Sequence, residues 1–340
     1  MKILIVASDK GGHFSPFIEE QSAALQQQGC EVLRFGIKGH GTMGYLRSLP
    51  ALKKFIREQQ PDLIHAHYGL SCLLASMQRL VPVVSTYHGS DIHDPYILPL
   101  SRLAMRRSAW NIFVSKTALS IAQNERFLPS PVCLERCTVL PCGVDLQAVK
   151  MLNKVDARKL LHLPPTAPLV LFAGAFDNAV KDAPLAKNAM AELADAQLIE
   201  LKGYSREEVF LLMQAADALL LTSRSEGSPQ VVKEAMACGC PIVSTDVGDV
   251  RELTAGIAGY YVASSREPLE LAALLREALA FARESELDKH ESDAGQAQSG
   301  RTNGRQRLIE KGYTNDRIAR QLMEIYTSVL SSRLRNSLSP

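Results

Sequence analysis

The sequence predicts an α/β protein built from two domains, each with a parallel sheet covered by helices on both faces. The chain has 340 residues, enough for two such domains. Short apolar runs alternate with helical stretches in both halves, as expected for parallel sheets. We expect an N-terminal domain over residues 1–148, a second domain over 149–313 and a final helix over 314–340 that packs back on the first.

The first half opens on an apolar strand at residues 2–7. A helix is expected at 14–28, where Gly29 ends it. The remaining strands of this half are expected at 31–35, 63–66, 83–87, 111–114 and 137–140.

The second half repeats the alternation. Its strands are expected at 169–173, 196–201, 218–221, 241–244 and 259–262. Residues 284–305 are polar without an apolar period, which predicts a loop or connector. Thr314 can cap the final helix. The apolar stripe of that helix consists of Ile318, Leu322, Ile325 and Val329.

The composition is that of an ordinary soluble globular protein, with 46% hydrophobic and 22% charged residues. A formal charge of +2 gives no reason to expect a nucleic-acid partner. No apolar run approaches the ~20 residues of a membrane span, and the first strand is too short for a secretory signal. The seven cysteines have no disulfide pattern, so we expect a cytoplasmic protein. Cys133, Cys137 and Cys142 lack the spacing of a zinc site.

Two glutamates in the second half are the strongest functional signal. Glu226 lies in the turn Glu226–Pro229, which follows the strand at 218–221, and Glu234 lies in the helical run 231–238. A strand, a tight turn and a helix in this order direct the free N–H groups of the helix at an anion. Because eight positions along a helix return to nearly the same face, we expect the two carboxylates to line one pocket.

The stretch Ser223–Glu252 resembles the nucleotide-sugar site of the family 4 retaining glycosyltransferases. Its second glutamate is followed by Ala-Met-Ala-Cys-Gly-Cys-Pro, close to the recurrent motif of that family. Other matching segments occur in the order of the family, at residues 11–13, 62–69, 87–91, 113–115, 139–145 and 169–174. The resemblance covers residues 1 to 330 and implies a GT-B fold, in which two Rossmann-like domains face each other across a central cleft.

The resemblance implies a retaining transfer of a sugar from a nucleotide-sugar donor to a hydroxyl of a saccharide or lipid-linked acceptor, in bacterial surface polysaccharide or glycolipid assembly. It makes His88, Glu226 and Lys181 the catalytic candidates. The candidates for donor binding are Gly11, Gly12, Gly174, Gly203, Tyr204, Arg224, Gly227, Ser228, Pro229, Val231 and Glu234. The candidates for the acceptor and the cleft wall are His13, His67 and Asp91.

The sequence departs from the family pattern at the cation that meets the diphosphate. Similar enzymes carry an arginine after the first strand of the second domain, where this chain has Ala175. A cation is needed there, because the leaving diphosphate gains negative charge. We expect Lys181 to supply it, with Arg224 and the helix N-terminus at Gly227–Ser228 as partial substitutes.

Two alternatives stay open. His65, His67, His88 and Asp91 carry metal-ligating side chains, which would suit a metal-dependent hydrolase. The missing arginine would suit a nucleotide-sugar-binding protein without turnover. The resemblance itself implies neither a cofactor nor a divalent metal ion.

A membrane contact is the last expectation. Leu46, Leu49, Leu52 and Phe55 recur at helical spacing. Basic residues accompany them, namely Arg47, Lys53, Lys54 and Arg57, with a second cluster at Arg102, Arg106 and Arg107. A basic amphipathic helix can lie on anionic lipid, so we expect peripheral contact at the inner face of the membrane. The alternative is a helix whose apolar face packs on the sheet.

Overall fold

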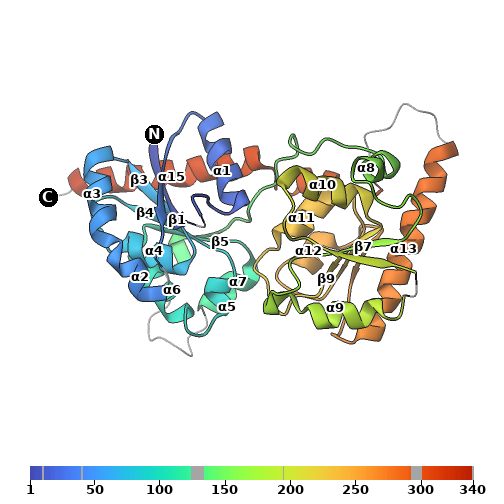
Figure 1. Cartoon of the computed structure of the whole chain (residues 1–340). Helices are drawn as coiled ribbons and strands as arrows, with labels where there is room; N and C mark the ends of the chain where they lie inside the picture. Colours follow the sequence, from blue (N-terminus) through green and yellow to red (C-terminus); the bar gives the residue numbers. More distant parts are fainter. Residues whose placement is uncertain (10, 40, 124–133, 194, 292–300, 339–340) are drawn as a thin grey trace. The chain divides into compact units, whose positions relative to one another are not determined.

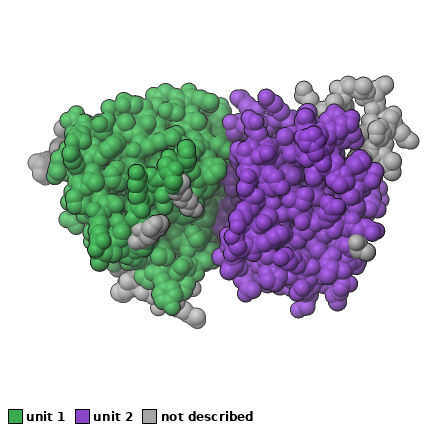
Figure 2. Space-filling model, viewed as in Figure 1, with its two compact units in different colours: residues 1–143, 313–340 green, residues 144–312 purple. Residues whose placement is uncertain are grey.

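The computed structural model describes the chain except for residues 10, 40, 124–133, 194, 292–300 and 339–340. The described residues form two compact units, residues 1–143 with 313–340, and residues 144–312 (Figures 1 and 2). The chain therefore leaves the first unit at Gly143, ahead of the boundary expected at 148. Arg305 of the second unit donates a 2.7 Å hydrogen bond to the carbonyl of Leu146, which ties this segment to that unit.

The first unit contains a six-stranded sheet in the order β2-β1-β3-β4-β5-β6, and all of its strands are parallel. Its strands are β1 (Lys2–Ser8), β2 (Glu31–Ile37), β3 (Leu63–His67), β4 (Val83–Tyr87), β5 (Trp110–Phe113) and β6 (Cys137–Val139). Its α-helices are α1 (Pro16–Gln27), α2 (Gly41–Arg47), α3 (Leu49–Gln59), α4 (Gly69–Ser76), α5 (Ser90–His93), α6 (Leu98–Arg107), α7 (Lys116–Gln123) and α15 (Asn315–Leu338).

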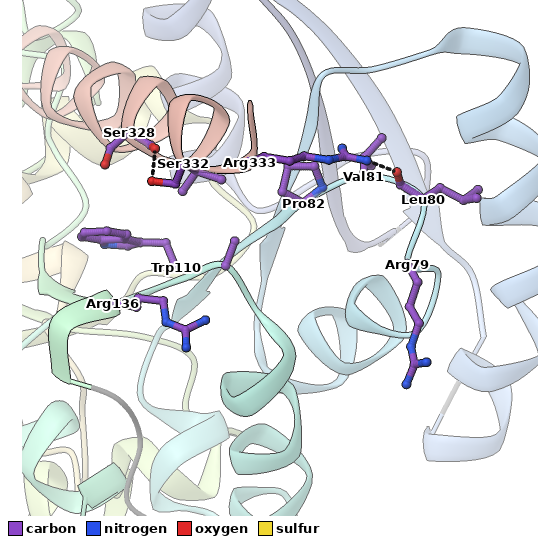
Figure 3. Close-up of a pocket in the computed structure, with 11 residues that line it drawn as sticks. Arg79, Leu80, Val81, Pro82, Trp110, Arg136, Ser328, Ser332 and Arg333 are labelled. Carbon is purple, nitrogen blue, oxygen red and sulfur yellow. Dashed lines mark hydrogen bonds between the residues drawn. The ribbon is translucent and has the colours of Figure 1, made fainter. Parts of the chain in front are cut away.

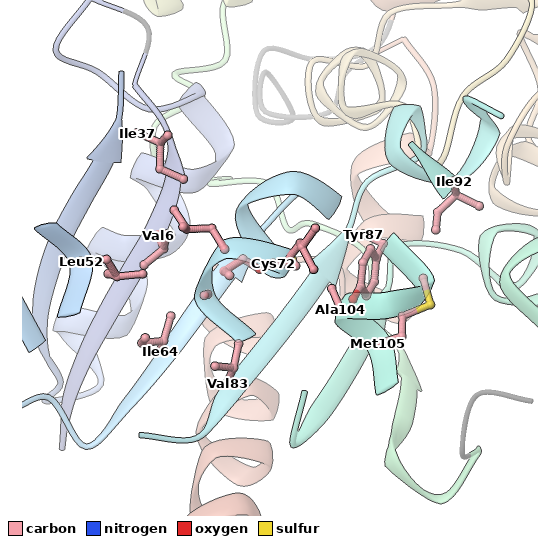
Figure 4. Close-up of a cluster of buried hydrophobic side chains, with 14 of the residues drawn as sticks. Val6, Ile37, Leu52, Ile64, Cys72, Val83, Tyr87, Ile92, Ala104 and Met105 are labelled. Carbon is pink, nitrogen blue, oxygen red and sulfur yellow. Dashed lines mark hydrogen bonds between the residues drawn. The ribbon is translucent and has the colours of Figure 1, made fainter. Parts of the chain in front are cut away.

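Alternate residues of these strands point into two separate cores, because side chains in a strand alternate between faces. Leu4 and Val6 of β1 face a core with α3, α4, α6 and α7 (Figure 4). Ile3 and Ile5 face the opposite core, with α1 and α15. Helix α15 thus belongs to the first unit although it is last in the sequence. Tyr326 of α15 is fully buried and its hydroxyl lies 2.6 Å from Nδ1 of His65.

The second unit contains a five-stranded parallel sheet in the order β11-β10-β9-β7-β8. Its strands are β7 (Leu169–Phe172), β8 (Gln197–Glu200), β9 (Ala218–Leu221), β10 (Ile242–Ser244) and β11 (Tyr260–Val262). Its α-helices are α8 (Lys154–Leu160), α9 (Ala183–Met190), α10 (Arg206–Ala215), α11 (Gln230–Ala237), α12 (Val250–Thr254), α13 (Pro268–Glu291) and α14 (Gly304–Glu310). Both parallel sheets predicted from the sequence are present, with strand ends shifted by a residue or two.

The prediction of a loop over residues 284–305 is wrong at both ends. Helix α13 continues to Glu291, and α14 begins at Gly304. The apolar residues Leu271, Leu275 and Leu279 pack α13 on β7, β9 and β10. Once that helix is nucleated, polar residues with good helix propensity extend it without needing an apolar face. Residues 292–300 lie outside the described part of the chain.

The apolar face expected to meet a membrane is turned inward. Leu52 of α3 is fully buried, and Leu49 and Phe55 pack against the same core, so this helix uses its apolar stripe for packing on the sheet. Arg102 is also buried, and its guanidinium donates to the carbonyls of Ala122 and Ile121 at 3.1 Å. It therefore does not belong to an exposed basic cluster. Within the described residues, no helix has the length and apolarity needed to cross a membrane.

Candidate functional site

Lys181 and Glu226 meet at the carboxyl edge of the second sheet. Lys181 ends the short 3-10 helix Ala179–Lys181 after β7, and Glu226 lies in the turn after β9. Because β7 and β9 are neighbouring parallel strands, the segments that follow them emerge side by side. The Lys181 ammonium lies 2.6 Å from Oε1 of Glu226, which also accepts a 2.7 Å hydrogen bond from the Ser223 hydroxyl. Both charged side chains are about four-fifths buried, with 19% and 18% of their area exposed.

The absence of a side chain at Gly174 leaves room for the side chain of Lys181. A Cβ at position 174 would lie 2.9 Å from Cγ of Lys181, closer than two such carbons approach. The glycine after β7 therefore lets the aliphatic part of the lysine lie against the backbone. This contact gives a structural reason for Gly174, which the sequence suggested only by its place after a strand.

The segment around Lys181 is tied to the turn after β9. The Thr222 hydroxyl donates to the carbonyl of Lys181 at 2.7 Å, and the N–H of Arg224 donates to the carbonyl of Val180 at 2.9 Å. These bonds join residues about forty positions apart in the sequence and hold the ammonium beside the glutamate.

Asp182 organises the arginines of this region. Its carboxylate lies 2.7 Å from Arg266 and 3.1 Å from Arg224. Burial would raise the pKa of Asp182, but the hydrogen bond from Arg266 and the charge of Arg224 outweigh it and hold the pKa below its ordinary value. Arg266 also donates to the carbonyls of Ser223 and Thr222. Arg224, expected to help replace the missing arginine, thus lies on Asp182 with 67% of its side chain exposed.

Glu234 has a different partner. It lies in α11 with 6% of its surface exposed, and its Oε1 lies 2.7 Å from the guanidinium of Arg206, the first residue of α10. Helix α11 begins only at Gln230, so Glu226 precedes it and the helical period does not relate the two glutamates. The argument that placed both on one helix face is therefore wrong. Each carboxylate is instead positioned by its own cation.

The turn before α11 holds the remaining candidates of this segment. Pro229 is the N-cap of the helix, and its side chain makes no capping hydrogen bond. Gly227 is buried beside Gly248. A Cβ on Gly248 would lie 2.6 Å from the carbonyl oxygen of Gly227. The Ser228 hydroxyl donates to Asp249 at 2.8 Å, and Val231 is half-buried. The helix N-terminus expected at Gly227–Ser228 therefore starts two residues later.

Gly203 and Tyr204 lie exposed between β8 and α10, at the same edge of the sheet. Gly203 has a φ of 83°, a left-handed conformation that favours glycine.

In the first unit, His88 is the centre of an aromatic cluster at the carboxyl edge of β3 and β4. Its Nε2 lies 3.0 Å from Nδ1 of His67, and its Nδ1 lies 3.8 Å from the sulfur of Cys142. The rings of Phe17 and Tyr68 lie 4.9 and 4.5 Å from the His88 ring. His67, expected from the sequence in the cleft wall, is fully buried. Burial lowers the pKa of His67 to about 3, so it stays neutral and fixes the orientation of His88.

Asp91 anchors the loop that carries His88. Its Oδ1 accepts hydrogen bonds from the backbone N–H groups of His88 and Gly89, both at 2.9 Å. Burial raises the pKa of Asp91 to about 6, partly offset by these two hydrogen bonds. These contacts make Asp91, a candidate for the acceptor from the sequence, an anchor of the loop.

Gly11, Gly12 and His13 follow β1 at the same edge and are exposed. The two glycines have φ values of 71° and 94°, and a Cβ on either would meet nothing within 4 Å. Backbone conformation, and not crowding, is what requires glycine here.

Most ligand atoms of the hydrolase alternative have other partners, although His67 Nε2 and Asp91 Oδ2 have none among the described residues. Both ring nitrogens of His65 are engaged, one with Tyr326 and one with Thr86 at 2.7 Å. The Asp91 carboxylate accepts hydrogen bonds from backbone N–H groups, and Nδ1 of His67 lies beside Nε2 of His88. No group of three metal-ligating side chains occurs among the described residues; Cys133 lies outside them. The geometry thus gives no support to a hydrolase centre.

Several residues of these clusters were missed by sequence reasoning. Arg206 and Arg266 come from segments with no motif, and only the fold brings them to Glu234 and Asp182. Tyr68 lies directly after β3 and Cys142 three residues after β6, on the side of the sheet where ligand-facing residues gather. That placement was the signal that could have identified them.

Comparison with known proteins identifies the class. The model of the Glycosyltransferase Family 4 matches residues 15–148, and that of the Glycosyl transferases group 1 matches residues 156–280. Together they span most of both units. The chain belongs to the family 4, group 1 glycosyltransferases.

Curated glycosyltransferases are among the proteins that match in sequence. The chain is 28% identical over 222 residues to TuaC, a glycosyltransferase of Bacillus subtilis assigned to teichuronic acid biosynthesis, covering 58% of this chain and 56% of that protein. It is 26% identical over 270 residues to the D-inositol 3-phosphate glycosyltransferase of Thermobispora bispora, covering 64% and 62%. The match thus spans less than two thirds of the length of each relative.

Solved structures support the fold. The sucrose-phosphate synthase of Thermosynechococcus elongatus superposes with a TM-score of 0.77 at 18% identity, over 97% of this chain and 99% of that one. HepE of Anabaena, solved with UDP-glucose, has a TM-score of 0.70 at 17% identity, over 96% and 100%. The chain has the GT-B fold predicted from its sequence.

Proposed function

We propose that this glycosyltransferase moves a sugar from a nucleotide-sugar donor to a hydroxyl acceptor with retention of anomeric configuration. The observation that carries the proposal is the Lys181–Glu226 pair, held at the carboxyl edge of the second sheet by Ser223 and Thr222. Ligands of open α/β sheets bind at this edge. HepE, which shares the fold, was solved with UDP-glucose, which favours the same class of donor.

In this proposal each charged group meets a different part of the donor. Lys181 and the first turn of α11 face the diphosphate, because ammonium and helix N–H groups both stabilise phosphate. Glu226 accepts hydrogen bonds from hydroxyls of the transferred sugar. Glu234 accepts hydrogen bonds from the ribose hydroxyls, and the nucleoside then replaces Arg206 as the partner of this carboxylate. On the first unit, His88 contacts the transferred sugar. The segment that contacts the diphosphate or the acceptor consists of Gly11, Gly12 and His13.

The reaction needs no covalent enzyme nucleophile. The bond between the anomeric carbon and the diphosphate oxygen breaks, and the acceptor oxygen bonds to that carbon on the same face. The acceptor proton passes to the departing phosphate oxygen, so charge and atoms balance. Lys181 stabilises the charge that grows on the diphosphate, and we propose that no divalent ion is required.

The pathway proposed is bacterial surface polysaccharide or glycolipid assembly, since the relative TuaC is assigned to teichuronic acid biosynthesis. The acceptor is then a saccharide or a lipid-linked saccharide. Peripheral membrane contact belongs to this proposal only through exposed basic residues such as Arg47, Lys54 and Arg57, because the apolar face of α3 is buried.

A panel of UDP-, GDP- and ADP-sugars tests the donor. A ligand that binds only the folded protein raises its melting temperature, and the matching donor should then show slow hydrolysis or transfer. Stabilisation without any turnover would support the nucleotide-sugar-binding alternative, for which Ala175 is the motivating residue. No stabilisation by any of the nucleotide sugars would contradict both.

A further inference from the structure

A basic pocket lies at the opposite edge of the first sheet from His88. It has a volume of about 580 Å³ and is lined by residues that precede β4, β5 and β6 and by the C-terminal half of α15. Its polar lining residues include Arg79, Arg136, Arg333, Trp110, Ser328 and Ser332. Strand β4 lies between this pocket and His88, and its five residues span about 16 Å. The pocket is therefore distinct from the candidate transfer site.

The segment that presents Arg79 is built by a buried glutamine. Gln78, 3% exposed, accepts hydrogen bonds from the N–H groups of Leu80 and Val81 and donates a 2.7 Å bond to the carbonyl of Val81. Within this brace Arg79 has a φ of 59°, a conformation unfavourable for a residue with a Cβ. A strained arginine held by a buried side chain is a feature typical of binding sites.

The other two arginines come from elements distant in the sequence. Arg333 of α15 reaches the carbonyl of Leu80 at 3.0 Å, and Figure 3 shows this bond across the pocket. Only one of its five donors is needed for that bond. Arg136 lies on the side of β6, next to Trp110, whose indole is fixed by a 2.9 Å hydrogen bond to Thr138.

The charge of this pocket is not neutralised within the described residues. No Asp or Glu is among the lining residues. Both Arg79 and Arg136 are exposed, and neither makes an ion pair or a hydrogen bond with the part of the chain that the structure describes. Arginines that line a pocket without an acid favour an anion, and the planar guanidinium suits phosphate, to which it can bond through two N–H groups.

We propose that this pocket binds a phosphate-bearing ligand, whose anionic groups are held by arginines of the pocket wall, Arg79, Arg136 or Arg333. Its volume is that of a small-molecule site. The Ser328 hydroxyl and the wall formed by Trp110 suit the remainder of the ligand, whose phosphate belongs either to a soluble sugar phosphate or to a lipid headgroup. The proposal does not depend on the donor or on the reaction at the other edge.

Trp110 allows a direct test, because it is the only tryptophan of the chain. Its fluorescence in the full-length protein is followed during titration with inorganic pyrophosphate at constant ionic strength. The same measurement is made with vesicles of phosphatidylcholine, with and without an anionic phospholipid. We expect a saturable change with pyrophosphate for a soluble ligand, or with the anionic vesicles alone for a lipid headgroup.

The variant Arg79→Glu/Arg136→Glu should raise the apparent Kd about tenfold or more, the effect of losing charged hydrogen-bond partners. Arg106→Glu/Arg107→Glu is the matched control, since both arginines are exposed on α6 and do not line the pocket. It should bind like wild type. Arg79→Gly removes one charge while suiting the observed φ of 59°, so it tests the charge without adding backbone strain.

Two outcomes would overturn the proposal. One is the absence of a saturable change with both pyrophosphate and anionic vesicles. The other is equal affinity in wild type and in the folded Arg79→Glu/Arg136→Glu variant.

Discussion

The ammonium of Lys181 lies 2.6 Å from the carboxylate of Glu226, although 45 positions separate them in the sequence. The pair joins the segment after β7 to the turn after β9, and each residue restricts the other. In the proposed function a donor must enter between groups that already balance each other's charge.

Glu226→Ala should lower turnover by roughly tenfold to hundredfold, since a charge-assisted hydrogen bond to the sugar is lost in the transition state. Affinity for the bare nucleoside diphosphate should not fall, because Lys181 stays in place and loses its competing carboxylate. Calorimetry with the nucleoside diphosphate and initial rates with the donor measure the two effects. A parallel loss of both, with the fold intact, would show that Glu226 does not act on the sugar.

Glu234→Ala should weaken nucleoside diphosphate binding by about tenfold to hundredfold, the effect of removing a charged acceptor for the ribose. Arg206→Ala is the control, because it breaks the same ion pair and keeps the carboxylate. It should bind more tightly than Glu234→Ala in calorimetry. If the two variants lose the same affinity, Glu234 acts only through its contact with Arg206.

Gly174→Ala should reduce kcat/KM while leaving the melting temperature nearly unchanged. The new methyl group would lie 2.9 Å from Cγ of Lys181, and the flexible lysine side chain can move away, carrying its ammonium from Glu226. Lys181→Ala alone should impair both binding and turnover, since the diphosphate is present before and during transfer. The double variant should be no worse than Lys181→Ala, because both changes act on one group. Additive losses would mean that Gly174 matters for another reason.

Asp91→Asn should remove a pH dependence of stability. The pKa of Asp91 is raised by burial to about 6, above the ~3.9 of an unfolded chain, so the folded state binds the proton more tightly. Its contribution to stability is therefore present at low pH and lost as the pH rises from about 4 to about 6. The asparagine keeps the acceptor for His88 and Gly89 without the charge.

Denaturant unfolding of both proteins between pH 4 and pH 8 measures the effect. The free energy of unfolding of Asp91→Asn relative to wild type should rise across that interval, by up to about 3 kcal/mol. A difference that stays constant with pH would show that the carboxyl group is not perturbed.

The sequence by itself determined the class of fold and the family. The alternation of apolar strands and helices is local, so it could be read without knowing any tertiary contact, and both predicted parallel sheets are present. The motif around Glu226 and Glu234 was visible for the same reason. The helix Leu49–Gln59 shows the limit of a local pattern, because its apolar stripe fits a membrane and a protein core equally well.

Tertiary structure decided which side chains meet. Arg206 pairs with Glu234 and Arg266 pairs with Asp182 across long stretches of chain, and no periodicity relates such positions. Gly174 owes its role to the lysine that lies against it, and the basic pocket exists only because α15 returns to the first sheet. These relationships depend on strand order and on the packing of distant elements, which short-range propensity does not specify.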